Sequence, residues 1–456
     1  MEPEVRAADE RLRSWLRRAG RSAAPSKNYG ATKAPIDDDD DDAAHLAGMQ
    51  QVEEEETIAR RVARRCRRVM CLLLSGVAIM LFITMMAAGY VAINDSDEIA
   101  FVTLGDWGCG PDNCRVPPTA PEGFHHGGSH QLSVAHKMAK AAEEISSKFV
   151  LALGDNFYWG GVNSDTDPLW KTVWLDRFSH ESLQTPWYAI LGNHDHYGNA
   201  EAQIDFSRKK LDCTHFKVCP SRWVLPRYWY SVVVPSDSKK FDVQFVFIDT
   251  VILAEGASMA LAEEKMKSGL PPHLKPEDID KWKKWAGQRK AMAKLQLEWF
   301  EHALNTSTAD WLIVAGHYPV FSGGEHGNTP ELQEQVLPLL KKYNVDAYLA
   351  GHDHTLQHLE DGGVHYFVSG SGALNGEYHP LPQSLFGTTQ NGFMAHRIKQ
   401  DSMEVQMINS QGEMVNKVVL RRKRNKGTQG SALENDLSAQ VDSLGKRVEK
   451  KVFRIF

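Results

Sequence analysis

Five short polar clusters in this chain contain the residue types that hold divalent and trivalent metals. In chain order they are GDWG at 105–108, GDNFY at 154–158, GNHDH at 192–196, GHYP at 316–319 and GHDH at 351–354. Together they offer carboxylates, a phenol, an amide oxygen and several imidazoles, which suit first-row metals. One tetrahedral zinc ion needs fewer donors. The pattern therefore favours two metals about 3.5–4 Å apart, bridged by one aspartate.

The segments before these clusters predict the elements that position them. Between 98 and about 420, short apolar runs alternate with longer amphipathic ones, which indicates an α/β architecture. Strands are predicted at 100–104, 149–153, 187–191, 241–248, 311–315, 347–350 and 365–368. Five of them end directly in a cluster, where glycine allows a sharp turn and leaves space beside a ligand. Because the carboxyl ends of strands meet at one edge of a sheet, we expect a single site.

In order and spacing, the five clusters resemble the metallophosphoesterase signature in its purple acid phosphatase form. The sequence is most similar to the small, mammalian-type tartrate-resistant acid phosphatases, over roughly residues 99–407. The likeness extends beyond the ligands themselves, over stretches such as 192–202 and 315–326. The resemblance implies a calcineurin-like α/β fold with four layers, in which two packed mixed sheets are flanked by helices. It also implies a hydrolase of the acid phosphatase type.

The same resemblance implies Fe(III) beside a second, divalent metal, which is iron, zinc or manganese. By position, the ferric ion would be held by Asp106, Asp155, Tyr158 and His354. The divalent ion would be held by Asp155, Asn193, His317 and His352. Tyr158 best separates the purple acid phosphatases from the wider superfamily, because a phenolate donor favours Fe(III) and gives the protein its colour. The alternative interpretation of Tyr158 is an aromatic side chain packed in the core.

Catalytic roles also follow from the resemblance. His194 and His326 match the histidines on the substrate side, and either could protonate the leaving group. Asp195 and His196 are expected to orient neighbouring ligands, and Asp353 to be structural. Two cations would neutralise phosphate and lower the pKa of a bound water, so that hydroxide attacks phosphorus even in mild acid.

Other functions remain open at this point. The same ligands could serve a phosphodiesterase or a nucleotide pyrophosphatase, because loops decide between these substrates. A membrane adaptor that keeps the scaffold without catalysis is a second alternative, although every expected ligand position is filled. Generation of oxygen radicals is a third, and it would require iron in both positions.

A membrane anchor is predicted before the catalytic region. Residues 70–93 contain no charged side chain, and a helix of this length crosses the roughly 30 Å hydrocarbon core. Six arginines lie between 60 and 68, whereas acidic residues follow at 95, 97 and 98. The positive-inside rule then places the N-terminus in the cytosol. We predict a cytosolic disordered tail at 1–68 and a single-pass type II anchor at 69–93. The catalytic domain at 98–420 would be lumenal, in a secretory or endolysosomal-type compartment, or extracellular.

Cysteine placement and a glycosylation sequence agree with that topology. Beyond the anchor, four cysteines form two local pairs, Cys109 with Cys114 and Cys213 with Cys219. Disulfides within these pairs are plausible in an oxidising compartment. Asn305 begins an Asn-Thr-Ser acceptor for N-glycosylation.

Three further segments depart from the resemblance. An insert at 109–131 carries His125, His126 and His130 and follows the first cluster, so it either reshapes the substrate entrance or is a bystander loop. Residues 255–294 form a charged insert that we interpret as a surface excursion and helix. The segment 421–456 is a basic polar tail whose apolar spacing is compatible with an amphipathic helix.

The net charge of the chain indicates which class of partner it binds. A formal net charge of −6 argues against nucleic acid, which normally requires a basic face. The expected substrates are phosphorylated small molecules or phosphoproteins, and the sequence leaves protein partners unassigned.

Overall fold

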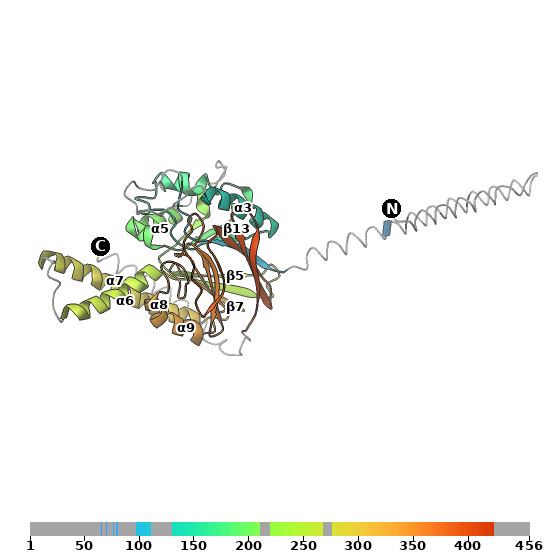
Figure 1. Cartoon of the computed structure of the whole chain (residues 1–456). Coiled ribbons are helices and arrows are strands. Elements are labelled where there is room, and N and C mark those ends of the chain that lie inside the picture. Colours follow the sequence, from blue (N-terminus) through green and yellow to red (C-terminus); the bar gives the residue numbers. More distant parts are fainter. Residues whose placement is uncertain are drawn as a thin grey trace, which may run out of the picture. The chain divides into compact units, whose positions relative to one another are not determined.

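The computed structural model describes residues 97–110, 130–209, 219–267 and 276–423, together with Arg65, Met70, Gly76, Ile79 and Met80 (Figure 1). The chain divides into two units, Met1–Val91 and Ala92–Phe456, and the fold below belongs to the second. The predicted cytosolic tail, most of the predicted anchor and all but the first residues of the C-terminal tail lie outside the described residues. Within the described part of the chain, no helix has the length and apolarity that crossing a membrane requires.

One seven-stranded sheet contains the first strands of the fold and its C-terminal strands, in the order β14-β13-β12-β1-β2-β3-β4. β1 to β4 run parallel, and β12 joins β1 in antiparallel orientation. The strands are β1 Ile99–Leu104, β2 Phe149–Ala152, β3 Trp187–Ala189, β4 Trp223–Val224, β12 Gly392–Ile398, β13 Ser402–Asn409 and β14 Met414–Arg421.

The second seven-stranded sheet has the order β11-β9-β10-β8-β7-β6-β5. Its central strands β6, β7, β8 and β10 are parallel, while β5, β9 and β11 join in antiparallel orientation. The strands are β5 Tyr230–Pro235, β6 Asp242–Phe247, β7 Trp311–Ala315, β8 Ala347–Ala350, β9 Leu356–Asp361, β10 Val364–Ser369 and β11 Ser384–Thr388.

The two sheets pack face to face through aromatic side chains. Phe101 of β1 and Phe149 of β2 stack on each other at 5.0 Å, and both meet Phe245 of β6 edge-on at 5.3 and 5.4 Å between ring centroids. Such edge-to-face contacts add to the stability gained by burying the rings. The main core is therefore shared by both sheets.

Helices cover the outer faces. α3 (His130–Glu144) packs its buried side, including Val134 and Met138, into the core of the first sheet. Helices on the other side share a second core with β6 to β8, through side chains such as Ile252, Phe300 and Leu332. These helices are α6 Thr250–Lys267, α7 Pro276–Asn305, α8 Pro330–Gln335 and α9 Leu337–Lys342. Figure 1 shows the resulting order of helices, sheet, sheet and helices, which confirms the predicted arrangement of two packed mixed sheets between helices.

All seven predicted strands are present, each within two residues of its predicted ends. The described residues of the charged insert at 255–294 lie in α6 and α7, which pack against each other, whereas 268–275 lie outside the described residues. Their contact is close at Gly256, where a Cβ would lie 2.4 Å from the Cβ of Ala293. α4 (Asn193–Tyr197) and α5 (Ala200–Arg208) follow β3 and lie beside the strand ends.

Candidate metal centre

The predicted donor clusters meet at the carboxyl ends of strands from both sheets. Asp106 follows β1, Asp155 follows β2 and His317 follows β7. All three residues are buried, and one ligand atom of each lies within 4.8 Å of the other two. Donors that lie 211 positions apart in the sequence thus form one cluster, as the strand-end argument predicts.

The turns that carry these donors have unusual backbone geometry. Asp106, Asp155 and His352 all have positive φ angles, of 56°, 50° and 70°. Non-glycine residues rarely adopt this region, and such strain concentrates at functional sites. Gly192 has a different role, because a Cβ there would lie 2.1 Å from Asp155 Oδ1. Glycine therefore provides the space beside the ligands that the sequence predicts.

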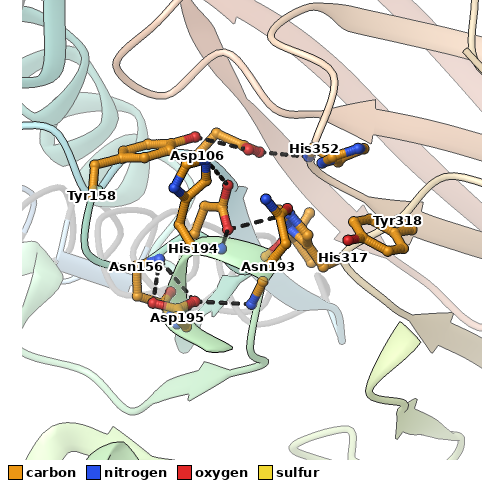
Figure 2. Close-up of polar contacts among 12 residues, drawn as sticks. Asp106, Asn156, Tyr158, Asn193, His194, Asp195, His317, Tyr318 and His352 are labelled. Atoms are coloured by element: carbon orange, nitrogen blue, oxygen red, sulfur yellow. Dashed lines mark hydrogen bonds and ion pairs between the residues drawn. The ribbon is translucent and has the colours of Figure 1, made fainter. Parts of the chain in front are cut away.

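One half of the centre is built around Tyr158, which is buried after β2. Its hydroxyl donates to Asp106 Oδ1 at 3.1 Å and lies 3.1 Å from His354 Nε2. His354 Nε2 in turn lies 3.7 Å from Asp106 Oδ1. The phenol, the carboxylate and the imidazole thus meet from three separate clusters. Figure 2 shows the contact between Tyr158 and Asp106.

The other half is built around His317 and Asn193. His317 Nδ1 lies 2.8 Å from the carbonyl oxygen of Leu153, so its Nε2 faces the centre. That Nε2 lies 3.1 Å from Asn193 Oδ1 and 3.4 Å from Asp155 Oδ1. His352 completes this half, with its ring centroid 5.2 Å from that of His317 and its backbone N–H donating to Asp106 Oδ2 at 2.7 Å. The five other predicted ligands therefore lie around the two aspartates.

The electrostatics of this group fit bound cations. Burial and the nearby charge of Asp155 raise the pKa of Asp106 well above its usual value. Two carboxylates in such proximity are not both ionised unless a cation compensates them. Burial lowers the pKa of His317 and lowers that of His352 well below its usual value, with neighbouring histidines adding to the effect for His352. These imidazoles stay neutral, which is the form that binds metals. Carboxylate, phenol, amide and imidazole donors together fit a pair of first-row ions.

Asp195 connects the loop after β2 with the loop after β3, and both loops carry predicted ligands. Its carboxylate accepts hydrogen bonds from the backbone N–H groups of Gly192 at 2.8 Å and Asn156 at 3.1 Å, and from Gln203 Nε2 at 2.8 Å. Figure 2 shows the contact between Asp195 and Asn156. Burial and the charge of Asp155 raise its pKa to about 7. The predicted orienting position of Asp195 is therefore matched by its contacts, whereas Asn156 and Gln203 were not anticipated.

His196 connects the centre to the helices of the other layer. Its Nε2 lies 2.8 Å from Asp249 Oδ2, and its ring stacks on Tyr228. The side chain of Gln296 in α7 both accepts from the backbone N–H of Asp249 and donates to its carbonyl. Asp249 was missed in the sequence, although it follows the predicted strand at 241–248 just as the recognised donors follow theirs; it lacks the glycine that marked the others.

The two substrate-side histidines have different surroundings. His194 Nδ1 lies 2.7 Å from the carbonyl oxygen of Trp159, and its Nε2 lies 3.9 Å from Asp155 Oδ2. His326 is partly exposed, and its Nδ1 lies 3.0 Å from Asp353 Oδ1, which also accepts from the backbone N–H of His326 at 2.7 Å. This hydrogen bond raises the pKa of His326. Asp353, expected to be only structural, thus orients a candidate catalytic side chain.

The structure describes only part of the predicted cysteine pairs and of the insert after the first cluster. Cys109 and Cys219 are each disulfide-bonded, but the predicted partners Cys114 and Cys213 lie outside the described residues, so the pairing remains a prediction. Of the histidines in the insert after the first cluster, only His130 is described, and it begins α3. Asn305 is exposed at the last position of α7, where a modifying enzyme can reach it.

Comparisons with known proteins agree with this geometry. Residues 100–356 match the family model described as calcineurin-like phosphoesterase. The chain is 33% identical over 337 residues to tartrate-resistant acid phosphatase type 5 of Homo sapiens, covering 71% of this chain and 91% of that protein. It is 33% identical over 331 residues to purple acid phosphatase 17 of Arabidopsis thaliana, covering 71% and 84%.

A solved structure shares the fold. GAP50, described as the anchor in the inner membrane complex of Plasmodium, superposes with a TM-score of 0.55 at 24% identity. The match covers 72% of this chain and 90% of that one. At this identity the likeness concerns the fold alone.

Proposed function

Because this chain belongs to the calcineurin-like phosphoesterases, and among them to the purple acid phosphatases, we propose that it hydrolyses phosphate monoesters at a dinuclear metal centre. The observation that carries the proposal is that two buried aspartates and five further candidate donors lie together, from five strand-end clusters of two sheets. Its substrates would be phosphorylated small molecules or phosphoproteins.

We assign the two halves of the centre to different metals. Asp106, Tyr158 and His354 would hold Fe(III), while Asn193, His317 and His352 would hold a divalent ion, with Asp155 shared. Burial, together with the charges of Asp106 and Asp155, raises the pKa of the Tyr158 phenol, so only a strongly charged cation would make it ionise. When bound, the metal pair supplies positive charge for the phosphate oxygens and lowers the pKa of the water that attacks phosphorus.

We assign the protonation of the leaving group and the binding of a phosphate oxygen to two histidine side chains. A carbonyl oxygen can only accept a hydrogen bond, so the contact with Trp159 places a proton on His194 Nδ1. The Nε2 atom, directed toward the centre, is the one that exchanges a proton with substrate. We propose that a protonated His194 donates from Nε2 to the departing oxygen, as a general acid. His326, held protonated by Asp353, would bind a phosphate oxygen.

Replacing Asp353 with asparagine should alter the pH dependence of hydrolysis. The Asp353 contact raises the pKa of His326, so His326 keeps its positive charge to higher pH. The variant loses that charge earlier, and the alkaline limb of kcat/KM should move to lower pH by about one unit. Asp361→Asn, at an ion pair with Lys341, is the control and should leave the limb in place. An unmoved limb in Asp353→Asn would remove His326 from this role.

One experiment tests the proposed function directly. The purified full-length chain should contain two metals, absorb broadly in the visible range, and hydrolyse p-nitrophenyl phosphate in acid faster than its bis ester. Tyr158→Phe should lose the visible band, whereas Tyr188→Phe on β3 should keep it.

The other outcomes identify the alternatives. Faster hydrolysis of the bis ester would favour a phosphodiesterase or nucleotide pyrophosphatase. A colourless but active protein would keep the phosphoesterase and reject the Fe(III) phenolate. A metal-free, inactive protein would favour a membrane adaptor.

We further propose the type II topology, with the catalytic domain lumenal or extracellular. The exposed acceptor at Asn305 should then carry a glycan when the full chain is expressed in cells that glycosylate. Asn305→Gln should remove a mobility shift that is sensitive to glycosidase, and Asn344→Gln, outside any acceptor sequence, should not. A chain whose mobility no glycosidase changes would argue for the opposite orientation.

A further inference from the structure

An exposed tyrosine lies beside the candidate general acid. Tyr197 is the last residue of α4, the short helix that also carries Asn193 and His194, and its side chain is 69% exposed. Residues three apart share a face of a helix, and the ring of Tyr197 meets that of His194 edge-on, with centroids 5.2 Å apart. A large aromatic group is thus presented to solvent next to the atom that would protonate a leaving group.

The backbone that carries Tyr197 is held firmly on both sides. The N–H of Gly198 donates to the carbonyl of Asp195 at 3.3 Å, and the N–H of Asn199 donates to the carbonyl of Val162 at 2.9 Å. A Cβ at position 198 would lie 2.2 Å from the carbonyl oxygen of Gly160, so the chain passes very close to the neighbouring loop. Because its backbone is positioned before any ligand arrives, Tyr197 can contribute to binding at low entropic cost.

Three aromatic rings surround His194, and Tyr197 is the outermost. Tyr158 and Trp159 meet His194 at 4.5 and 5.3 Å between centroids, but Tyr158 is buried and Trp159 is only partly exposed. The Nδ1 atom of His194 is engaged with the carbonyl of Trp159. Among the three rings that contact His194, Tyr197 therefore has the most surface available to a ligand.

A second tyrosine, on the other sheet, lies beside one of the predicted metal ligands. Tyr318, which follows β7, places its ring 4.4 Å from that of His352. Burial raises the pKa of Tyr318, and the charge of Asp155 raises it further. Tyr197 and Tyr318 thus each contact a histidine of the site, His194 and His352 respectively.

We propose, on the basis of the proposed phosphatase function, that Tyr197 is a specificity-determining residue which favours planar aromatic leaving groups over alkyl ones. The oxygen that departs must lie within reach of His194, so the group attached to it extends over Tyr197. An aryl group can stack on or meet the exposed ring, whereas a small alkyl group contacts little of it. The phosphate itself binds elsewhere and is indifferent to this residue.

The test compares Tyr197→Ala and Tyr197→Phe in the full-length, metal-loaded chain, with phenyl phosphate and glycerol 2-phosphate as substrates. Tyr197→Ala should raise KM for phenyl phosphate about 3- to 10-fold, the range that the loss of one aromatic contact produces, and should leave glycerol 2-phosphate within about 2-fold. Tyr197→Phe should resemble the wild type, because the ring and not the hydroxyl provides the contact. Val419→Ala, at an exposed site on the edge strand β14, is the control.

Equilibrium binding separates this inference from the proposed function. Phenylphosphonate and methylphosphonate cannot be hydrolysed at the P–C bond in this way, so calorimetry with each reports binding even if the wild type proves inactive. Weaker binding of phenylphosphonate alone to Tyr197→Ala would support the inference. An equal loss for both phosphonates, or no loss for either, would overturn it, because the residue would then act only through His194 or not at all.

Discussion

Replacing Asp155 with asparagine should reduce phosphate hydrolysis about 10³-fold or more and release bound metal. The expected loss corresponds to several kcal/mol of transition-state stabilisation that a bridged metal pair supplies. Asp155 lies 3.4 Å from His317 Nε2 and accepts from the backbone N–H of His194 at 2.9 Å. Its position between the two halves of the centre explains why one change should affect both.

In the metal-free protein, the same variant should raise the free energy of unfolding near neutral pH. Burial and the charge of Asp155 raise the folded pKa of Asp106 above its unfolded value of about 3.8. The stability that such a group contributes is complete below the unfolded pKa and is lost as pH rises through the folded one. Removing the charge of Asp155 lessens that loss, so the metal-free variant should be more stable than the metal-free wild type near neutral pH.

Metal analysis, kinetics and chemical denaturation check both statements. Asp205→Asn, an exposed carboxylate on α5, is the matched control and should keep full activity and metal. If Asp155→Asn retained two metals and near-normal rates, the shared-ligand role would be wrong. If the metal-free variant were less stable than the metal-free wild type, the repulsion argument would fail instead.

Replacing Asp195 with alanine should destabilise the fold by about 3–5 kcal/mol. The carboxylate is fully buried and accepts from the backbone of Gly192, Asn156 and Phe157 and from the side chain of Gln203. Each buried donor left without an acceptor costs about 1–3 kcal/mol. Against a total stability of about 5–15 kcal/mol, this loss is large. Denaturant titration measures it.

Asp195→Asn is the matched variant, because it keeps the volume and one oxygen acceptor. It should lose less stability than the alanine variant. In the metal-free wild type, the raised pKa of about 7 means that stability from Asp195 declines between about pH 4 and 7. Asparagine cannot ionise, so this part of the pH dependence should disappear. Equal losses in the two variants would show that the volume and the single acceptor that asparagine keeps contribute nothing, and the predicted graded loss would be wrong.

The strands that the sequence predicts share a physical property. β2, β7 and β8 are buried at every position, so they read as continuous apolar runs. The missed strands β5 and β14 alternate buried or half-buried with exposed positions, and both lie at sheet edges. The polar residues of β14 weaken its apolar pattern, because one face meets water. β5 has three consecutive valines, so its composition is compatible with a strand, but the sequence does not show which neighbour it pairs with.

The sequence by itself identified the candidate donors of the centre. Residue type sets metal preference, and a strand that ends in glycine and a polar residue delivers that donor to the sheet edge, as at Asp106 and Asp155. Both properties are local, so they can be read without the fold.

Only the tertiary structure decided what supports those donors. Asp353 orients His326 across 27 positions, Asp195 clamps Asn156 across 39, and Asp249 meets His196 across 53. A carboxylate has the same chemistry in each place. Its role depends on which donor it faces, and that is set by how two sheets and their helices pack, because packing brings together residues whose spacing in the chain carries no signal.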